Sequence, residues 1–358
     1  MRRKNCLTVI LITGFLLGLF VWNTFGEKVD YSESERRALA KFPKVTAESV
    51  LSGKFAEGFE EYTVDAFPMR DTWRSVKAYA KTFIFAQKDN NGIYTADGHL
   101  SKIEYPMNEK MLDHAIQIFA NVKGKYLKDN NVYFAMVPDK NLYLAGKNGY
   151  LSLDYNAFTE YMKQGMEFAE YIEIADLLSA DDYYRTDTHW KQEALTDVAE
   201  RIAKEMGVEL TQDYNVEKLH VPFNGVYVGQ SALVCESDNI SYLTNTVLER
   251  VTVEGAKAVY DMDKAKGRDA YEMFLSGNQP IITMRDSENA EGKRLILFRD
   301  SFGSSIAPLF MSGYSEIVLI DLRYISSEML GEYVDFKNAD VLFLYSALML
   351  NNSLGMKY

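Results

Sequence analysis

The chain has 358 residues, of which 47% are hydrophobic and 25% charged, an ordinary composition for a globular protein with a large core. Its net charge is −12, and the first 26 residues contain three bases and no acid, so residues 27–358 carry −15. A body this acidic argues against nucleic-acid binding, which needs a basic surface. Its two cysteines, Cys6 and Cys235, exclude a disulfide framework.

Residues 1–26 have the composition of an export signal. Three bases at positions 2–4 precede an uncharged apolar run from Cys6 to Trp22. This arrangement predicts a membrane anchor with its basic end in the cytoplasm and the rest of the chain outside. The run is at the short limit for spanning a bilayer, so a cleaved signal peptide is the alternative. In both cases we expect the body to lie outside the cytoplasm.

Residues 27–100 predict a helical lead-in that docks on the main domain. Residues 47–62 carry apolar side chains at helical spacing, and a second helix is expected over 72–87, after a break at Asp65–Asp71. Residues 91–100 contain Asp97-Gly98 between short apolar stretches, which predicts a β-hairpin.

Residues 101–358 predict an α/β domain with a mainly parallel sheet flanked by helices. Helices are expected at 111–127, 155–166 and 190–206, and strands at 131–137, 171–174, 295–298, 317–320 and 341–345. Residues 207–290 have a weak pattern and are interpreted as a β-rich insertion. Ligands of such sheets bind at the carboxyl ends of the strands, where Lys140, Ser301, Arg323 and Ser346 should gather.

Ser301 lies between a predicted buried strand and a helix-like stretch, in Arg299-Asp300-Ser301-Phe302-Gly303. A serine at such a turn exposes its hydroxyl beside free backbone N–H groups, which are the parts that acyl transfer requires. Asp300 is expected to hold the turn by accepting N–H groups. The alternative is that Ser301 only caps the helix.

His189 is the best candidate for a general base among the four histidines. It lies in Asp187-Thr188-His189-Trp190, where Asp187 can turn back to accept from one ring nitrogen while the other faces Ser301. Trp190 can pack under the imidazole and shield it from water. The alternative is a helix cap with a surface histidine. A metal site is disfavoured because no second His or Cys stands at ligand spacing.

The Asp187–Trp190 stretch resembles the signature of the bacterial DHHW family, which is similar to the SGNH-hydrolase-like proteins that O-acetylate alginate and other exopolysaccharides. Other stretches that match in order and spacing are Glu35–Leu39 with Phe42-Pro43, Asp65–Asp71, Val137–Asn141, Asp300–Gly303 and Asp321–Tyr324.

The resemblance implies an SGNH-hydrolase-like fold with Ser301 as nucleophile, His189 as base and Asp187 as orienting acid. The order of the blocks is circularly permuted relative to typical SGNH hydrolases, as in the alginate-acetylation relatives. The chain departs from the family pattern at two positions. Arg299 replaces the glycine that is common before Asp-Ser, and Thr188 replaces the histidine that is the second residue of the signature.

Other site residues have less support from the sequence. The N–H of Ser301 is expected to donate to the oxyanion, and Gly303, Asn224 and Tyr345 are further candidates. Arg323 and Lys140 are candidates for binding an anionic sugar or acetyl donor, with a structural ion pair as the alternative.

The resulting hypothesis is an extracytoplasmic serine O-acetyltransferase or acetyl-esterase that acts on a cell-envelope polysaccharide without a cofactor. A transferase is expected to work beside a membrane-bound O-acyltransferase that delivers acetyl groups outward. The alternative is a non-catalytic envelope protein that binds glycan or assembly partners.

Overall fold

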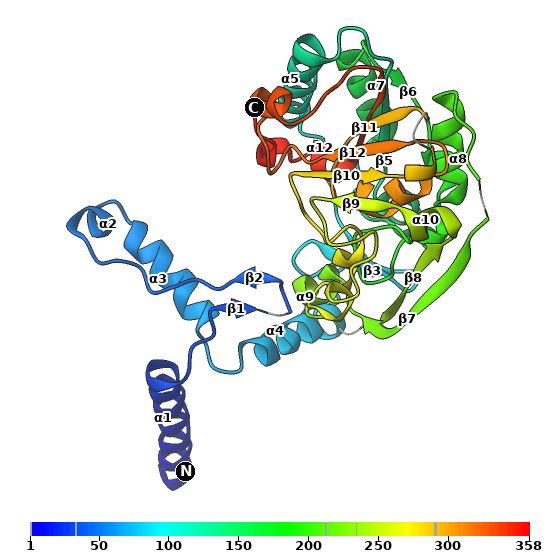
Figure 1. Cartoon of the computed structure of the whole chain (residues 1–358). Helices are drawn as coiled ribbons and strands as arrows, with labels where there is room; N and C mark the ends of the chain where they lie inside the picture. The colour runs from blue at the N-terminus through cyan, green and yellow to red at the C-terminus, as the bar shows by residue number, and fades with distance from the viewer. Residues whose placement is uncertain (1, 33, 212, 234, 290–291) are drawn as a thin grey trace. The chain divides into compact units, whose positions relative to one another are not determined.

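The computed structural model describes residues 2–32, 34–211, 213–233, 235–289 and 292–358 (Figure 1). The chain forms two compact units. The first consists of residues 1–91 and 228–234, and the second of residues 92–227 and 235–358.

The second unit is built on a seven-stranded sheet with the order β6-β5-β13-β11-β12-β10-β9. Strands β6, β5, β13, β11 and β12 are parallel, whereas β10 pairs antiparallel with both β12 and β9. Their bounds are β5 (Val132–Val137), β6 (Glu170–Tyr171), β9 (Thr252–Glu254), β10 (Ile281–Arg285), β11 (Arg294–Arg299), β12 (Glu316–Ile320) and β13 (Ala339–Ser346). This arrangement confirms the predicted α/β class.

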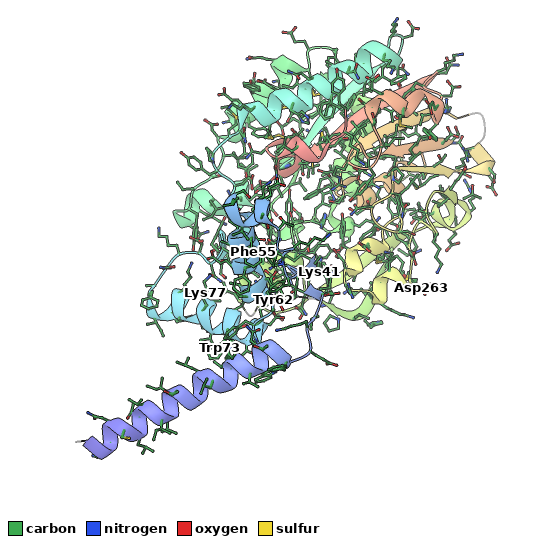
Figure 2. All side chains as sticks on the ribbon, turned by 90° about the vertical axis from the view of Figure 1, so that its left-hand side faces the viewer. Lys41, Phe55, Tyr62, Trp73, Lys77 and Asp263 are labelled. Atoms are coloured by element: carbon green, nitrogen blue, oxygen red, sulfur yellow. The ribbon has the colours of Figure 1, made fainter. Side chains whose placement is uncertain are left out.

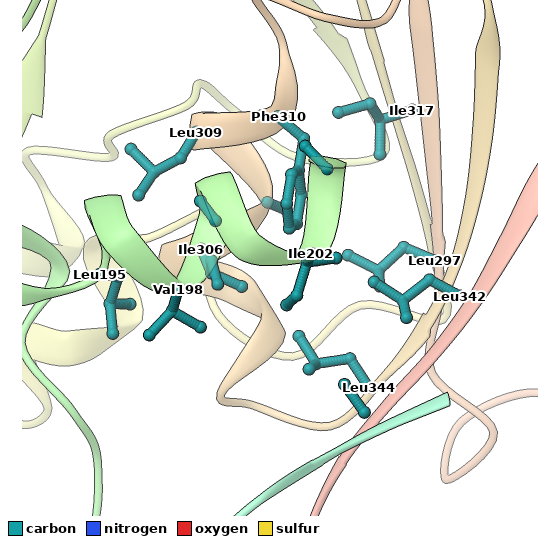
Figure 3. Packing of buried hydrophobic residues seen from close by; sticks show 14 of the residues in the cluster. Leu195, Val198, Ile202, Leu297, Ile306, Leu309, Phe310, Ile317, Leu342 and Leu344 are labelled. Atoms are coloured by element: carbon teal, nitrogen blue, oxygen red, sulfur yellow. The ribbon is translucent and has the colours of Figure 1, made fainter. Parts of the chain in front are cut away.

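Helices cover both faces of this sheet, and for that reason its central strands are apolar on both sides. One face packs against α8 (Thr196–Glu205), α11 (Gly303–Ile306) and the 3₁₀ turn η8 (Ala307–Phe310), as Figure 3 shows for Ile202, Ile306 and Leu342. The other packs against α5 (Glu109–Tyr126), α7 (Tyr155–Gly165) and α12 (Ala347–Leu350).

Smaller elements surround the sheet in the second unit. Two antiparallel hairpins pair β3 (Ile93–Ala96) with β4 (His99–Lys102), as predicted for residues 91–100, and β7 (Asn215–Phe223) with β8 (Asp238–Thr244). The remaining helices are α6 (Asn141–Asn148) and α10 (Thr246–Arg250). The described part of residues 207–290 thus holds one hairpin, while β9 and β10 belong to the main sheet.

Three predicted helices differ from the observed ones. The helix expected at 47–62 is divided into α2 (Ala47–Leu51) and α3 (Lys54–Asp65), because Gly53 adopts φ +79° between them. The one expected at 72–87 is α4 (Arg70–Tyr79), continued by the π-helical turn η1 (Ala80–Ile84). The one expected at 190–206 begins only at Thr196, after a 3₁₀ turn at Gln192–Ala194.

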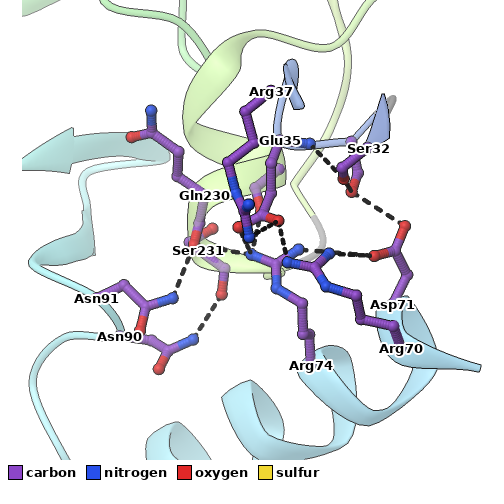
Figure 4. Close-up of polar contacts among 12 residues, drawn as sticks. Ser32, Glu35, Arg37, Arg70, Asp71, Arg74, Asn90, Asn91, Gln230 and Ser231 are labelled. Atoms are coloured by element: carbon purple, nitrogen blue, oxygen red, sulfur yellow. Dashed lines mark hydrogen bonds and ion pairs between the residues drawn. The ribbon is translucent and has the colours of Figure 1, made fainter. Parts of the chain in front are cut away.

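The first unit contains α1 to α4, the strands β1 (Tyr31–Ser32) and β2 (Arg37–Ala38), and part of α9 (Val226–Ser231). Helix α1 (Arg2–Phe25) is apolar and long enough to cross a membrane over Lys4–Phe25, so it can serve as a signal anchor or a membrane span. An ionic cluster lies between α4 and the β1–β2 segment, where Glu35 pairs with both Arg70 and Arg74 (Figure 4).

Candidate active site

Ser301 follows the central strand β11 and lies on a turn that Asp300 holds in place. The Asp300 carboxylate accepts from the backbone N–H of Phe302 (2.9 Å) and from the N–H and hydroxyl of Ser346 (2.8 and 2.6 Å). Ser346 ends the neighbouring strand β13, so the turn is fixed across two strands. The two strand ends therefore meet at the carboxyl edge of the sheet, as expected.

Asp187 and His189 approach this turn from a separate loop. One carboxylate oxygen of Asp187 lies 2.6 Å from His189 Nδ1 and accepts the His189 backbone N–H at 3.1 Å. Its other oxygen accepts the N–H of Val226 at 2.8 Å. His189 Nε2 lies 2.8 Å from Ser301 Oγ. The structure thus brings the three side chains into one hydrogen-bonded row.

Hydrogen bonds to the Asp238 carboxylate hold the loop that carries Asp187 in place. The Asp238 carboxylate accepts from the N–H groups of Arg185 (2.9 Å) and Thr186 (2.8 Å) and from the Thr186 hydroxyl (2.5 Å). The Thr186 hydroxyl in turn accepts the N–H of Gly225 at 2.8 Å. Buried hydrogen bonds of this kind restrict the loop and fix the direction of the Asp187 side chain.

Trp190 links the loop that carries His189 to the turn that carries Ser301. Its indole N–H lies 3.1 Å from the Phe302 carbonyl and 3.0 Å from Ser305 Oγ, and the residue is fully buried. Its ring packs edge-on against Phe302. Trp190 was expected to pack under the imidazole of His189, but Tyr271 occupies that position instead.

Tyr271 stacks on His189, with ring centroids 3.8 Å apart and planes inclined by 12°. Its hydroxyl lies 2.9 Å from Ser305 Oγ, and burial raises the pKa of Tyr271 above its usual value. Tyr271 belongs to the 3₁₀ turn Ala270–Met273, a stretch whose sequence has no helical or strand period, so sequence reasoning missed it.

The candidate oxyanion donors lie in different environments. Among the described residues, no acceptor is found for the N–H of Ser301, whereas the N–H of Gly303 donates to the Asp300 carbonyl at 3.1 Å. Asn224 is exposed, and its side-chain oxygen accepts from Ser237. Tyr345 packs against Phe119 on the sheet face opposite that of Trp190. The structure therefore leaves Ser301 N–H as the best-placed donor.

The two candidate anion-binding cations are engaged within the protein. Lys140 is buried and donates to the carbonyls of Tyr184 (2.7 Å) and Arg185 (3.1 Å), and burial lowers its pKa to about 7. Arg323 forms a bidentate ion pair with Asp321 at 2.8 and 2.5 Å. Lys140 thus supports the loop that leads to Asp187, and Arg323 fits the alternative of a structural ion pair.

The other three histidines lie apart from this row. His99 is buried in β4 near Asp181, His114 contacts Ser353, and His220 lies in β7. Within the described ranges, no three His, Cys, Asp or Glu side chains come together in a way that could hold a metal ion. A hydrogen-bonded row of carboxylate, imidazole and hydroxyl groups, such as Asp187, His189 and Ser301 form, can activate a serine as a nucleophile.

The chain was compared with protein-family models, with curated proteins and with solved structures. No protein-family model matches it, and neither does any curated protein. Among solved structures it is similar to a DHHW family protein from Eubacterium siraeum, with a TM-score of 0.59, 20% identity and coverage of 75% of this chain and 95% of that one.

A second similar protein is Bacillus cereus PatB1. Its structure with a sulfonyl adduct gives a TM-score of 0.57 and 16% identity over 74% of this chain and 97% of that one. Another structure of PatB1 gives a TM-score of 0.53 and 15% identity over 72% of this chain and 96% of that one. At such low sequence identities, the similarity to these structures is a similarity of fold only. It confirms the SGNH-hydrolase-like α/β class and the resemblance in fold to a DHHW family protein.

Proposed function

We propose that this protein is an extracytoplasmic serine O-acetyltransferase or acetyl-esterase that acts on a cell-envelope polysaccharide. The observation that carries the proposal is the continuous row from Asp187 through His189 to Ser301, with contacts of 2.6 and 2.8 Å. The resemblance of the sequence to the DHHW family and its relatives in alginate O-acetylation supports the choice of an acetyl group and a glycan.

In the proposed reaction, Ser301 Oγ attacks the carbonyl carbon of an acetyl donor while His189 Nε2 takes the hydroxyl proton. Asp187 stabilises the imidazolium that forms, and the free N–H of Ser301 donates to the oxyanion. When the tetrahedral intermediate collapses, the donor's oxygen leaves with the proton from His189. A sugar hydroxyl, or water in an esterase, then attacks the acetyl-enzyme with His189 again as the base.

The N-terminal helix supports a location at the outer surface of the membrane. Helix α1 has three bases at its start and an apolar span, so the positive-inside rule directs the rest of the chain outward. A transferase at that surface needs acetyl groups from inside the cell, and a membrane-bound O-acyltransferase is the partner that would supply them.

The test is hydrolysis of p-nitrophenyl acetate by the purified protein. Ser301→Ala and His189→Ala should each lower turnover by roughly 10³-fold or more. Ser304→Ala is the matched control, because Ser304 lies one turn further along and has no contact with His189 among the described residues. Unchanged rates in the first two variants would remove the catalytic proposal.

Covalent labelling gives a second readout that does not need the natural substrate. Since PatB1 has been solved with a sulfonyl adduct, a sulfonyl fluoride is a suitable probe for an activated serine in the same fold. We expect one adduct on the peptide that contains Ser301 and none in His189→Ala. A label on another serine would move the site.

The second candidate is a non-catalytic envelope protein that binds glycan or assembly partners. One observation favours it: of the donors considered for the oxyanion hole, the Gly303 N–H is bound to Asp300 and Tyr345 faces away from His189. An enzyme with few oxyanion donors would be slow. Absence of both hydrolysis and labelling, with retained glycan binding, would select this candidate.

A further inference from the structure

Helix α4 and the π-helical turn η1 have their charged face inward and their apolar face outward. Arg70 and Arg74 form ion pairs with Glu35 (Figure 4). Arg74 also donates to the Gly229 carbonyl at 2.7 Å, and Ala78 on the same side is buried. On the opposite side the helix exposes large apolar side chains. These are Trp73, Val76, Tyr79 and Phe83, followed by Ile84 and Phe85.

This outward face is unusually apolar for a surface helix. Phe83 is 72% and Ile84 75% exposed, and Trp73 projects from α4 beside Lys77 (Figure 2). Contiguous exposed apolar side chains of this kind mark a binding surface. Tyr79 and Phe83 stack at 5.4 Å and make the surface continuous.

The charged side chains within residues 72–88 all have one sign. Residues 72–88 contain four bases and no acid. Arg74 is used in the ionic cluster, whereas Lys77 and Lys81 have no hydrogen bond or ion pair to any described residue. Aromatic and aliphatic side chains flanked by lysines form the pattern of a helix that lies in the interface of an anionic bilayer.

The start of α4 lies next to the end of the apolar helix α1. Trp22 of α1 lines the same cleft of about 450 Å³ as Met69, Arg70 and Thr72, and Lys28 donates to the Ala66 carbonyl at 3.2 Å. A tryptophan at the end of a membrane span lies at headgroup level. The beginning of α4 is therefore at headgroup level whenever α1 spans the bilayer.

We propose that α4 and η1 form a second membrane contact, in which Trp73, Val76 and Phe83 enter the outer surface of an anionic lipid bilayer. The inference rests on the anchored location proposed above and not on the chemistry of Ser301. It fixes the first unit at the bilayer by two elements, the span α1 and the interfacial segment 73–85.

The test uses the full chain, reconstituted in vesicles of phosphatidylglycerol and phosphatidylcholine. Trp22→Phe leaves two tryptophans, Trp73 and the fully buried Trp190, which provides a constant background. We expect brominated lipids to quench the Trp73 emission and aqueous iodide to leave it unchanged. The quenchable emission should disappear when Trp73→Phe is added.

Two results would overturn the proposal. Quenching of Trp73 by iodide but not by bromolipid would mean that the apolar face is exposed to water and is a binding surface for another protein. Protection from both quenchers would mean that another part of the chain covers it. Because Ser301→Ala can be used throughout, the result does not depend on whether the chain is an enzyme.

Charge and apolar variants provide matched controls. Lys77→Gln and Lys81→Gln should each lower the docking equilibrium about fivefold in anionic vesicles and much less in phosphatidylcholine alone. Phe83→Ser should reduce docking in both. Lys110→Gln and Leu354→Ser, at exposed positions of the second unit, should leave Trp73 quenching unchanged. Equal effects of the patch and control variants would contradict the proposal.

Discussion

The ring of Tyr271 lies parallel to the imidazole of His189 at a centroid distance of 3.8 Å, while its hydroxyl reaches Ser305 behind the serine turn. Asp187 fixes one edge of the imidazole and Tyr271 covers one face, so rotation of the ring away from Ser301 is opposed in two directions. Tyr271 thereby acts as a positioning residue in the proposed mechanism, without itself contacting the Ser301 hydroxyl.

Tyr271→Ala should lower kcat for p-nitrophenyl acetate by about 10²-fold, because the loss of the stacked ring lets the imidazole move by an ångström or more. Tyr271→Phe keeps the ring and loses only the hydroxyl, so its kcat should fall much less. Equal loss in both variants would show that the hydroxyl, not the stacking, matters.

Asp187→Asn should lower kcat by about 10⁴-fold, the effect of replacing the carboxylate that holds a catalytic histidine in the correct tautomer. Both Asp187 oxygens accept hydrogen bonds, from His189 and from the N–H of Val226, and an amide can accept at only one of them. Circular dichroism should show that the variant is folded. Activity within tenfold of wild type would exclude Asp187 as the orienting acid.

The sheet and the meeting of Asp187, His189 and Ser301 could be predicted from the sequence, because their signals are local. Strands such as Leu295–Phe298 are apolar throughout, since both sheet faces are buried, and each ends at a polar turn. Asp187 and His189 are two residues apart, so their contact follows from the local chain. The position of Ser301 follows from the carboxyl-end rule for parallel strands.

Other features depend on contacts between distant segments and have no local signal. Tyr271 reaches His189 from a turn 82 positions later, in a segment without helical or strand period. A helix is predicted from the sequence over 72–87, where α4 lies, but its apolar face points outward because Glu35 holds the arginines of the opposite face. The sequence pattern identifies a helix and its two faces; it does not identify which face is buried.

Lys140→Met should change the pH dependence of stability. Burial lowers the pKa of Lys140 from 10.5 to about 7, so between these values the unfolded chain binds a proton that the folded chain has released. The contribution of Lys140 to stability is therefore fully present above pH 10.5 and is lost as the pH falls toward 7. Urea unfolding at pH 7 and pH 10 should show wild type gaining stability relative to the variant.

The control for Lys140 is Lys110→Met, at an exposed position of α5, whose stability relative to wild type should not vary over the same pH range. A constant difference between wild type and Lys140→Met would contradict the assigned pKa. At pH 10 the Lys140 variant should be less stable by about 1–3 kcal/mol, because the Tyr184 and Arg185 carbonyls lose their donor.

Asp65→Asn should weaken the first unit at neutral pH. Hydrogen bonds from Arg37 lower the pKa of the Asp65 carboxyl to about 2, against the opposing effect of burial. The Asp65 carboxylate contributes roughly 2 kcal/mol to the free energy of unfolding at pH 7. This contribution is fully present above pH 3.8 and is lost as the pH falls through 2. Unfolding at pH 7 and pH 3 tests it. Asp30→Asn, which removes an exposed ion pair with Lys41, should have little effect.

Gly225→Ala should impair the site although it replaces none of the residues Asp187, His189 and Ser301. Gly225 has no Cβ, and one added there would collide with the Cα and Cβ of Asp187 and with the Thr186 carbonyl. The loop must then withdraw, which breaks the bond from Val226 N–H to Asp187 and lets that carboxylate turn away from His189.

We therefore expect a fall in kcat of about 10²-fold for Gly225→Ala, with a smaller change in KM, because the substrate surface is retained while the catalytic row is displaced. Gly146→Ala is the control: it lies in α6 with no atom near the added Cβ, and should keep full activity. Wild-type kcat in Gly225→Ala would mean that Asp187 tolerates displacement, and the close packing of this glycine against the carboxylate would then have no role in the reaction.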